Sequence, residues 1–220
     1  MKKFLIIGLG RFGKSVLKEL YLSGHEVVGC DRDPKALNEV EDFSTFLVEG
    51  EATDDDVLEE MNVNDFDSII VSMGDNFEAA VLIVTKLKNK GCQHIISKAN
   101  DRLRGQALSA VGADQVIYPE EETGTRLAKQ IATPGVLEYV ELAPNCTGIE
   151  MEVPQEFIGR SLSQIDLRKK YNVTLVLINR KSEEYPIIAP GANEVFQSND
   201  LIFIIGEDKH LEKLKRKLKK

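Results

Sequence analysis

Residues 1–133 alternate short apolar runs with amphipathic stretches, and this alternation constrains the fold more strongly than any other feature of the sequence. Runs that stay apolar throughout suit strands buried on both faces, and strands separated by helices form parallel sheets with right-handed crossovers. We therefore predict an α/β fold with a doubly wound parallel sheet. The expected strands are 4–7, 26–30, 45–48, 68–72, 94–97 and 115–118, and the main expected helices are 14–22, 55–61, 79–88, 103–111 and 125–131.

The pattern changes at the Thr-Pro-Gly sequence of residues 133–135, where proline ends the last helical stretch. A succession of strands with few helices predicts a second, smaller α+β domain. We place the first domain at residues 1–135 and the second at 140–220. The second domain is expected to hold strands at 148–153, 173–179, 185–189 and 201–205, a short helix at 162–169 and a last helix from residue 208.

Charge and cysteine content exclude several classes of protein. The chain has 28 Lys and Arg against 36 Asp and Glu, a formal net charge of −8, which disfavours general nucleic-acid binding. No apolar run approaches the roughly 20 residues that a membrane helix needs. The three cysteines are far apart and form no CxxC pair, so we expect neither a disulfide framework nor a zinc ribbon. The same cysteine content leads us to expect a cytoplasmic location.

A glycine motif, GLGRFG at residues 8–13, directly follows the first predicted strand and opens a helix. Gly8 would allow a tight turn, Gly10 would let a pyrophosphate approach the backbone, and Gly13 would permit close contact between helix and strand. Asp31 ends the next strand, where a carboxylate can accept hydrogen bonds from ribose hydroxyls. This context predicts a Rossmann-like dinucleotide site. A tight turn without any ligand is the alternative.

Ligands of open parallel sheets bind beyond the carboxyl ends of the strands, so polar residues at those ends are candidate contacts. Helix capping is the alternative explanation for Asp54, Asp75 and Asp101, which stand at expected helix starts. Arg32 could meet the 2′-phosphate of NADP, but the adjacent carboxylate of Asp31 would repel that phosphate. The candidates are Asp31, Arg32, residues 50–54, residues 72–76, Lys98 and residues 119–120.

Groups suited to catalysis are missing from the expected crevice. His25 and His94 precede strands and so lie at the opposite edge of the sheet, and His210 falls in the terminal helix. Cys30 lies inside a strand and is expected to be a small core residue. The sequence contains no GxSxG, HExxH or histidine pair at metal-binding spacing. We therefore expect a nucleotide site that senses its ligand and is not an enzyme.

An ordered series of segments resembles one known family. KFLIIGLGRFG, VVGCDRDP, VEGEATD, SIIVSMGDN, IISKAND and VGADQVIYPEEETG are similar to the regulator-of-K⁺-conductance domain, RCK or KTN, also called TrkA-N. IGRSL, IDLRKKY and NDLIFIIG, within residues 158–206, are similar to the TrkA-C domain. The resemblance covers nearly the whole chain, and with one unit of each kind it is closest to the cytosolic gating subunits of Ktr-type potassium transporters.

The resemblance implies a homodimer that assembles into an octameric ring beneath a membrane potassium-translocating subunit, peripheral to the inner face of the plasma membrane. It also implies that ATP or ADP, or alternatively NAD(H), binds in the crevice. Lys98 would meet phosphates, Arg11 would reach the γ-phosphate across the dimer, and Glu120 would lie near a cation, divalent or monovalent, between the phosphates. The other implied contacts are Gly8, Gly10, Phe12, Gly13, Asp31, Arg32, Glu51, Ala52, Thr53, Met73, Gly74 and Asp75.

Some positions depart from the family pattern. Glu51 stands where many members have Asp or Asn, which could alter ribose or cation contacts. Some relatives bind cyclic di-AMP at the C-terminal domain, and Arg168 matches a phosphate-contacting arginine there. Thr174 replaces the family's asparagine, however, and a surface cation is the alternative reading of Arg168.

Three functions remain open on sequence alone. A nucleotide-sensing gating subunit of a potassium uptake system leads, ahead of an NAD(P)-dependent oxidoreductase and a free-standing dinucleotide sensor. The basic tail at residues 209–220 predicts an amphipathic helix with a solvated charged face, and attraction to anionic lipid is the alternative.

Overall fold

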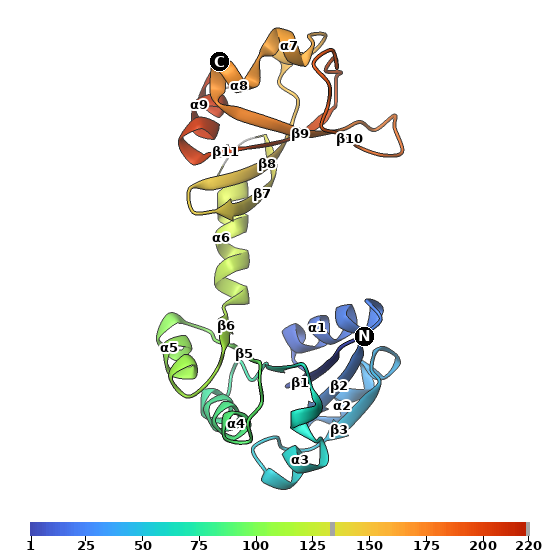
Figure 1. Ribbon diagram of the computed structural model, residues 1–220, viewed down its shortest axis with the longest axis vertical. Helices are drawn as coiled ribbons and strands as arrows, with labels where there is room; N and C mark the ends of the chain where they lie inside the picture. The colour runs from blue at the N-terminus through green and yellow to red at the C-terminus, as the bar shows by residue number, and fades with distance from the viewer. Residues whose placement is uncertain (133–134, 219–220) are drawn as a thin grey trace. The chain divides into compact units, whose positions relative to one another are not determined.

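The computed structural model describes residues 1–132 and 135–218, and the chain folds as two compact units, Met1–Glu122 and Thr123–Lys220 (Figure 1). Helix α6, Pro119–Ile131, begins in the first unit and ends in the second. The predicted break at Thr133 and Pro134 lies outside the described residues, and the predicted domain boundary near residue 140 stays a prediction. No helix in the described part of the chain is long and apolar enough to cross a membrane.

The first unit contains a six-stranded, all-parallel sheet in the order β3-β2-β1-β4-β5-β6. β1 pairs with β2 on one side and with β4 on the other, so the direction of winding reverses there. Ligands of doubly wound sheets bind at such a reversal. The strands are β1 Lys3–Ile7, β2 Glu26–Asp31, β3 Phe46–Glu49, β4 Ser68–Val71, β5 Ile95–Lys98 and β6 Gln115–Ile117.

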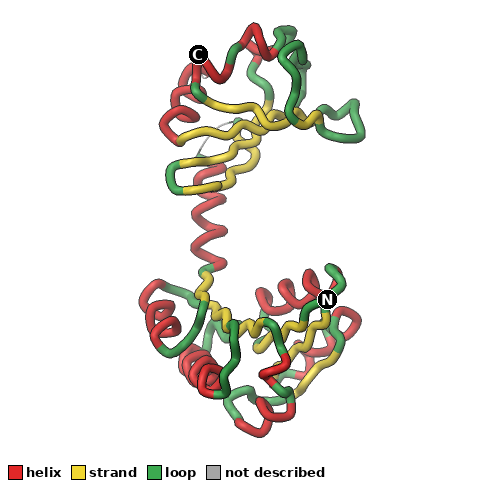
Figure 2. The backbone as a smooth tube through the Cα atoms, viewed as in Figure 1, coloured by secondary structure: helices red, strands yellow, loops and turns green. Residues whose placement is uncertain are grey.

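Helices alternate with these strands, as the sequence predicts (Figure 2). Asp101 caps its helix by accepting from the Arg104 amide at 2.8 Å, which confirms one predicted cap. Asp75 is not a cap, because Asn76 beside it accepts from the Ala79 amide at 3.1 Å. Asp54 holds an N-cap position without a side-chain capping bond. The helices are α1 Arg11–Leu22, α2 Pro34–Asn38, α3 Asp55–Glu60, α4 Phe77–Asn89 and α5 Arg102–Ala110.

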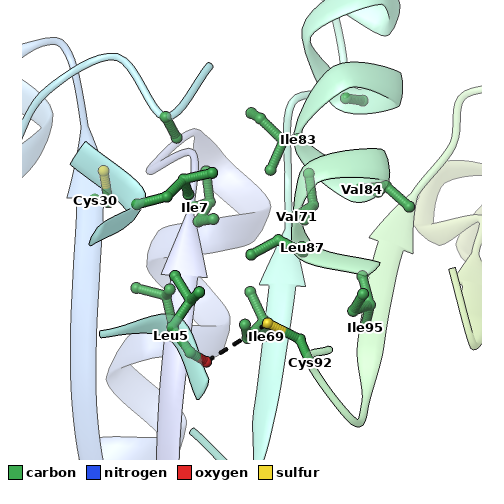
Figure 3. Packing of buried hydrophobic residues seen from close by; sticks show 14 of the residues in the cluster. Leu5, Ile7, Cys30, Ile69, Val71, Ile83, Val84, Leu87, Cys92 and Ile95 are labelled. Carbon is green, nitrogen blue, oxygen red and sulfur yellow. Dashed lines mark hydrogen bonds between the residues drawn. The ribbon is translucent and has the colours of Figure 1, made fainter. Parts of the chain in front are cut away.

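Apolar side chains fill both faces of this sheet. Leu5 and Ile7 join one cluster, whereas Ile6 between them joins the other, as the two-residue period of a strand requires. Figure 3 shows Ile83 and Leu87 of α4 packed over the strands of the first cluster. Each leucine or isoleucine buried in this way contributes about 2–5 kcal/mol against truncation to alanine. The two clusters hold the helices against the sheet, and the parallel pairing of the strands puts their carboxyl ends at one rim.

The second unit contains a five-stranded antiparallel sheet in the order β10-β9-β11-β8-β7. Two predictions need correction here: β10 spans only two residues, and the single expected helix is two helices separated at Asp166, whose φ is +54°. Strand β7, Val136–Ala143, was not predicted as part of this sheet, yet it pairs with β8. The elements are β7 Val136–Ala143, β8 Cys146–Glu152, α7 Leu162–Ile165, α8 Leu167–Tyr171, β9 Val173–Asn179, β10 Ile187–Ile188, β11 Leu201–Glu207 and α9 Asp208–Leu218.

A buried ion-pair network ties the long loop before β11 to β9. Arg180 follows β9, and its Nε and Nη2 atoms donate to both oxygens of Asp200 at 3.0 and 3.1 Å. The same guanidinium donates to Glu183 at 3.1 Å and to Glu194 at 3.0 Å. These carboxylates raise the Arg180 pKa above its ordinary value, with the Asp200 hydrogen bond as the largest cause. The charge of Arg180 is thus fixed inside the unit.

Candidate functional site

The glycine loop joins β1 to α1, and each glycine meets a different steric demand. Gly8 has φ +90°, and a Cβ there would lie 2.8 Å from the Ser72 carbonyl oxygen. A Cβ on Gly13 would collide with the carbonyl oxygen of Gly8, so this glycine permits the close approach of helix and loop. Gly10 caps α1 and has nothing within 4 Å of its Cβ position. Space therefore remains open at the start of α1, where unpaired amides favour an anion.

Asp31 lies at the end of β2 and is fixed by two backbone amides. Its Oδ2 accepts from the Leu9 amide at 2.6 Å, and its Oδ1 accepts from the Asp33 amide at 2.9 Å. A carboxylate oxygen can accept more than one hydrogen bond, so both oxygens keep capacity for ribose hydroxyls. The first of these bonds also joins the end of β2 to the glycine loop.

A narrow hollow lies between the ends of β1, β2 and β3 and the loop after β4. It encloses about 40 Å³, well below the roughly 300 Å³ of a typical ligand pocket. Arg32 Nη1 donates to Glu51 Oε2 at 3.2 Å in this lining. Both side chains of this pair are partly exposed, at 70% for Arg32 and 33% for Glu51. The lining residues are Ile7, Gly8, Cys30, Asp31, Arg32, Gly50, Glu51, Ala52 and Met73.

Cys30 forms part of that lining, and its thiol is unreactive at neutral pH. The residue is 1% exposed, and burial together with the neighbouring Asp31 and Glu51 raises the pKa of its thiol to about 12. Its Sγ faces the Gly50 carbonyl oxygen at 3.9 Å. The thiol therefore stays protonated at neutral pH, and the predicted packing role of Cys30 is confirmed.

Lys98 and Glu120 form an ion pair where β5 ends and α6 begins, at one side of the crevice. Lys98 Nζ donates to Glu120 Oε1 at 2.6 Å, and this hydrogen bond is the largest cause that lowers the pKa of Glu120. A Cβ on Gly74 would lie 3.0 Å from Lys98 Nζ. The loop after β4 and the end of β5 are therefore adjacent, as predicted from their positions in the sequence.

Two supporting residues were missed at the level of sequence. Asn100 Nδ2 donates to the Gly74 carbonyl oxygen at 2.6 Å, which holds the loop after β4. Lys86 Nζ on α4 donates to the Thr53 carbonyl oxygen at 2.6 Å and pairs with Asp55 at 3.1 Å, which holds the loop after β3. Amides and lysines with such roles carry no local motif, so only the fold shows them.

The remaining predicted contacts lie at the rim of the crevice. Arg11, the first residue of α1, and Asp75 are exposed, whereas Phe12 and Thr53 are partly buried, and none of the four lines the narrow hollow. Within the described residues, no group of three or more His, Cys, Asp or Glu side chains could hold a metal ion. A cation beside Glu120 would therefore need most of its ligands from a nucleotide.

The two histidines of the first unit lie at the opposite edge of the sheet from this rim, and the third belongs to the second unit. His94 Nδ1 is bonded to Ser68 Oγ at 2.7 Å, at the start of β4, and His25 packs against the Phe4 ring. His210 on α9 is bonded to Asn172 at 3.1 Å. Neither His25 nor His94 is placed at the carboxyl ends of the parallel strands.

Comparison with known proteins decides the family. Residues 4–119 match the TrkA-N domain, and residues 148–219 match the TrkA-C domain. The chain belongs to the TrkA-N and TrkA-C family. The predicted resemblance and the predicted fold class, a doubly wound sheet with a smaller α+β domain, are both confirmed.

Relatives of the TrkA family extend over nearly the whole chain. The chain is 34% identical to the Ktr system potassium uptake protein C of Bacillus subtilis (strain 168), over 99% of this chain and 97% of that protein. It is 32% identical to the Ktr system potassium uptake protein A of Vibrio alginolyticus, over 97% of each. The solved structure of the GsuK channel bound to NAD matches with a TM-score of 0.65 at 18% identity, over 99% of this chain and 39% of that one. This last likeness is one of fold.

The TrkA-C unit has a pocket of its own, of about 360 Å³. Arg168 on α8 and Thr174 on β9 both line this pocket. The two positions at which the sequence was compared with the cyclic di-AMP site of relatives therefore lie in one pocket. Arg168 is exposed. The other lining residues are Leu162, Ser163, Asp166, Leu167, Val173, Leu175, Pro190 and Ala192.

Proposed function

We propose that this chain is the nucleotide-sensing regulatory subunit of a membrane potassium uptake system and that it works on the cytoplasmic side of the membrane. The named relatives at 34% and 32% identity are potassium uptake proteins of Ktr systems, aligned over almost their full length. The observation that carries the sensing role is the crevice itself, where open space at Gly10, the fixed carboxylate of Asp31 and the cation of Lys98 lie on one sheet edge.

ATP and ADP are the proposed ligands, with NAD(H) as the alternative. Asp31 would accept the ribose hydroxyls, the start of α1 would bind phosphate, and Lys98 would pair with a further phosphate. Ala52, Thr53 and the loop from Met73 through Gly74 to Asp75 would frame the adenosine. Glu120, released from Lys98 by the incoming phosphate, would face a cation held between phosphate oxygens.

NADP fits this crevice poorly for two reasons. The carboxylate of Asp31 would repel a 2′-phosphate. Arg32, which follows Asp31 and could compensate, is paired with Glu51. Glu51, which departs from the family pattern, would compete with a 2′-phosphate for this arginine, and the repulsion from Asp31 remains the main argument against NADP.

The proposed signal passes between copies of the chain. In a dimer that assembles to an octameric ring, the exposed Arg11 would reach the γ-phosphate held by a neighbouring copy. ATP and ADP would then favour different arrangements of the dimer, because a ligand shifts an equilibrium only by its differential affinity. About 1–3 kcal/mol of coupling is typical of such sites. The pocket at Arg168 is the proposed second site, for cyclic di-AMP.

Calorimetric titration of the full chain with ATP, ADP, NADH and NADPH tests the proposal. Asp31→Asn should weaken binding of the first three about tenfold or more, since a hydrogen bond to a charged group contributes about 1.5–3 kcal/mol. Because Asp31 also bonds to the Leu9 amide, Gly10→Ala is a second variant, whose methyl group enters open space and leaves the fold intact.

Asp42→Asn is the matched control, because Asp42 is exposed and lies outside the crevice. Unchanged affinity in both crevice variants would remove the crevice as the nucleotide site. Stoichiometric hydride transfer from NADH to a small carbonyl compound would favour the oxidoreductase instead.

A further inference from the structure

Positive charge is distributed very unequally along this acidic chain. Residues 1–122 contain 13 Lys and Arg against 23 Asp and Glu, a net charge of −10, whereas residues 123–220 contain 15 against 13, a net charge of +2. Much of the positive charge of the second unit falls in α8 and α9, which pack against each other. The charge asymmetry therefore has a defined location in the fold.

The terminal helix α9 has an apolar side and a basic side. Leu211 and Leu214 are 2% and 0% exposed and belong to the core of the unit. Lys213 and Arg216 are exposed, and their three-residue spacing puts them on one face, away from the two leucines. Glu212 does not neutralise them, because it pairs with Lys215 at 3.0 Å. The outward side of α9 is thus a cationic surface.

The short helix α8 continues this surface. Arg168, Lys169 and Lys170 are consecutive and exposed, while Leu167 and Tyr171 on either side of them are buried. Asn172, directly after α8, is bonded to His210 of α9 at 3.1 Å, which holds the two helices side by side (Figure 1). We call Arg168, Lys169, Lys170, Lys213 and Arg216 the α8–α9 basic face.

We propose that the α8–α9 basic face binds the anionic headgroups of a phospholipid membrane. The leucines of α9 are already buried in the unit, so contact would be electrostatic and peripheral, without insertion of an apolar helix face. Fluid anionic headgroups need no fixed geometry to pair with flexible lysine and arginine side chains, and each such residue near the surface adds to the attraction. Nucleic acid is disfavoured as the occupant, because the chain as a whole carries a formal net charge of −8.

Vesicle flotation with the full chain tests this inference without any transporter, so its outcome is independent of the proposed function. The triple variant Lys170→Glu, Lys213→Glu, Arg216→Glu reverses three charges of the face and leaves Arg168 in its pocket. The matched control reverses three exposed lysines elsewhere, as Lys2→Glu, Lys35→Glu, Lys181→Glu, with the same change in net charge. Circular dichroism and ATP titration check that both variants fold.

Wild type and control should float with phosphatidylcholine vesicles that contain phosphatidylglycerol and not with phosphatidylcholine alone. The triple variant should bind the anionic vesicles roughly 100-fold more weakly, the factor that three lost headgroup attractions give. High salt should release the wild type, because the interaction is screened beyond about 10 Å at 0.1 M ionic strength.

Equal binding of the triple variant and the control would overturn the proposal, as would equal binding of wild type to neutral and anionic vesicles. If the wild type binds neither kind of vesicle, and the triple variant alone loses self-association, the lipid proposal fails. The α8–α9 basic face would then bind an acidic surface of a second copy of the chain.

Discussion

The ion pairs Arg180–Asp200 and Lys98–Glu120 have similar chemistry and opposite surroundings. In the TrkA-C unit, the Arg180 and Asp200 side chains are 8% and 1% exposed, and Glu183, Glu194 and the Val195 carbonyl oxygen take further arginine donors. In the crevice, Glu120 is 67% exposed and Lys98 is 13% exposed. Arg180 is surrounded by permanent partners, whereas Lys98 is paired with a carboxylate that solvent and ligands can reach.

This difference separates structural charge from charge that is available to a ligand. A buried pair that loses one member leaves the other charge unpaired in a poor solvent, at a cost of about 3–5 kcal/mol. An exposed pair contributes about 0–1 kcal/mol, because water replaces either partner. A phosphate can therefore displace Glu120 from Lys98, while no ligand can compete for Arg180. Exposure of the partner therefore distinguishes the Lys98 pair from the Arg180 pair, and its place at the crevice makes the charge of Lys98 available to a ligand there.

The largest expected effect comes from Arg180→Met, which should destabilise the TrkA-C unit by about 3–5 kcal/mol. Asp200 would remain buried, and the loop between β10 and β11 would lose its attachment to β9. Denaturant unfolding of the full chain measures this change. The adjacent exposed residue supplies the control, Lys181→Met, which should stay within about 0.5 kcal/mol of wild type. Similar stabilities of the two variants would show that the network is not structural.

A smaller effect on stability and a larger one on binding are expected for Lys98→Met. Stability should change by about 1 kcal/mol or less, since the partner of Lys98 is exposed. ATP and ADP affinity should fall about tenfold or more through loss of the charge-assisted bond to phosphate. Calorimetry and unfolding of the same preparation separate the two quantities. A variant that is strongly destabilised but binds ATP and ADP normally would show that Lys98 has a structural role, like Arg180.

The smallest expected effect concerns pH. Lys98 holds the pKa of Glu120 below its ordinary value, so the pair stabilises the fold above the ordinary glutamate pKa. This contribution is lost as the pH falls through the lowered pKa of the folded protein. Because Glu120 is exposed, the gain amounts to a few tenths of a kcal/mol, up to about 1 kcal/mol. Glu120→Gln should remove that acid-side loss in unfolding titrations, and a difference from wild type that grows towards low pH would contradict the assignment.

Local signals in the sequence were enough to predict the alternating elements of the first unit. The glycine spacing at residues 8–13 and the position of Asp31 after a strand follow from the tight turn and the close helix–strand contact of a Rossmann-type loop, so the sequence alone predicts them. The edge strand β7 was missed as a strand because Glu138 and Glu141 interrupt its apolar residues. The break between α7 and α8 was missed because Asp166 can adopt a left-handed conformation without glycine.

Long-range partners could not be predicted from the sequence. Arg180 meets Asp200 and Glu194 across a loop, and no periodicity links these positions. The pairing of Arg32 with Glu51 likewise joins the ends of two strands. It means that neither residue can be interpreted as a ligand contact without the other. Asn76 in place of Asp75 as the cap of α4 reflects a shift of one residue, which propensity does not resolve.

The two amide bonds to Asp31 have a consequence for the entropy of ligand binding. Because the Leu9 and Asp33 amides already fix both carboxylate oxygens, the rotational freedom of this side chain is lost when the protein folds. A ribose that binds Asp31 therefore meets a preorganised acceptor and need not order it. Arg32 and Glu51 are different, since both side chains of their pair are partly exposed and keep some freedom to rearrange. A nucleotide bound as proposed would therefore have to order Arg32 and Glu51 at an entropic cost, whereas Asp31 would remain in place throughout.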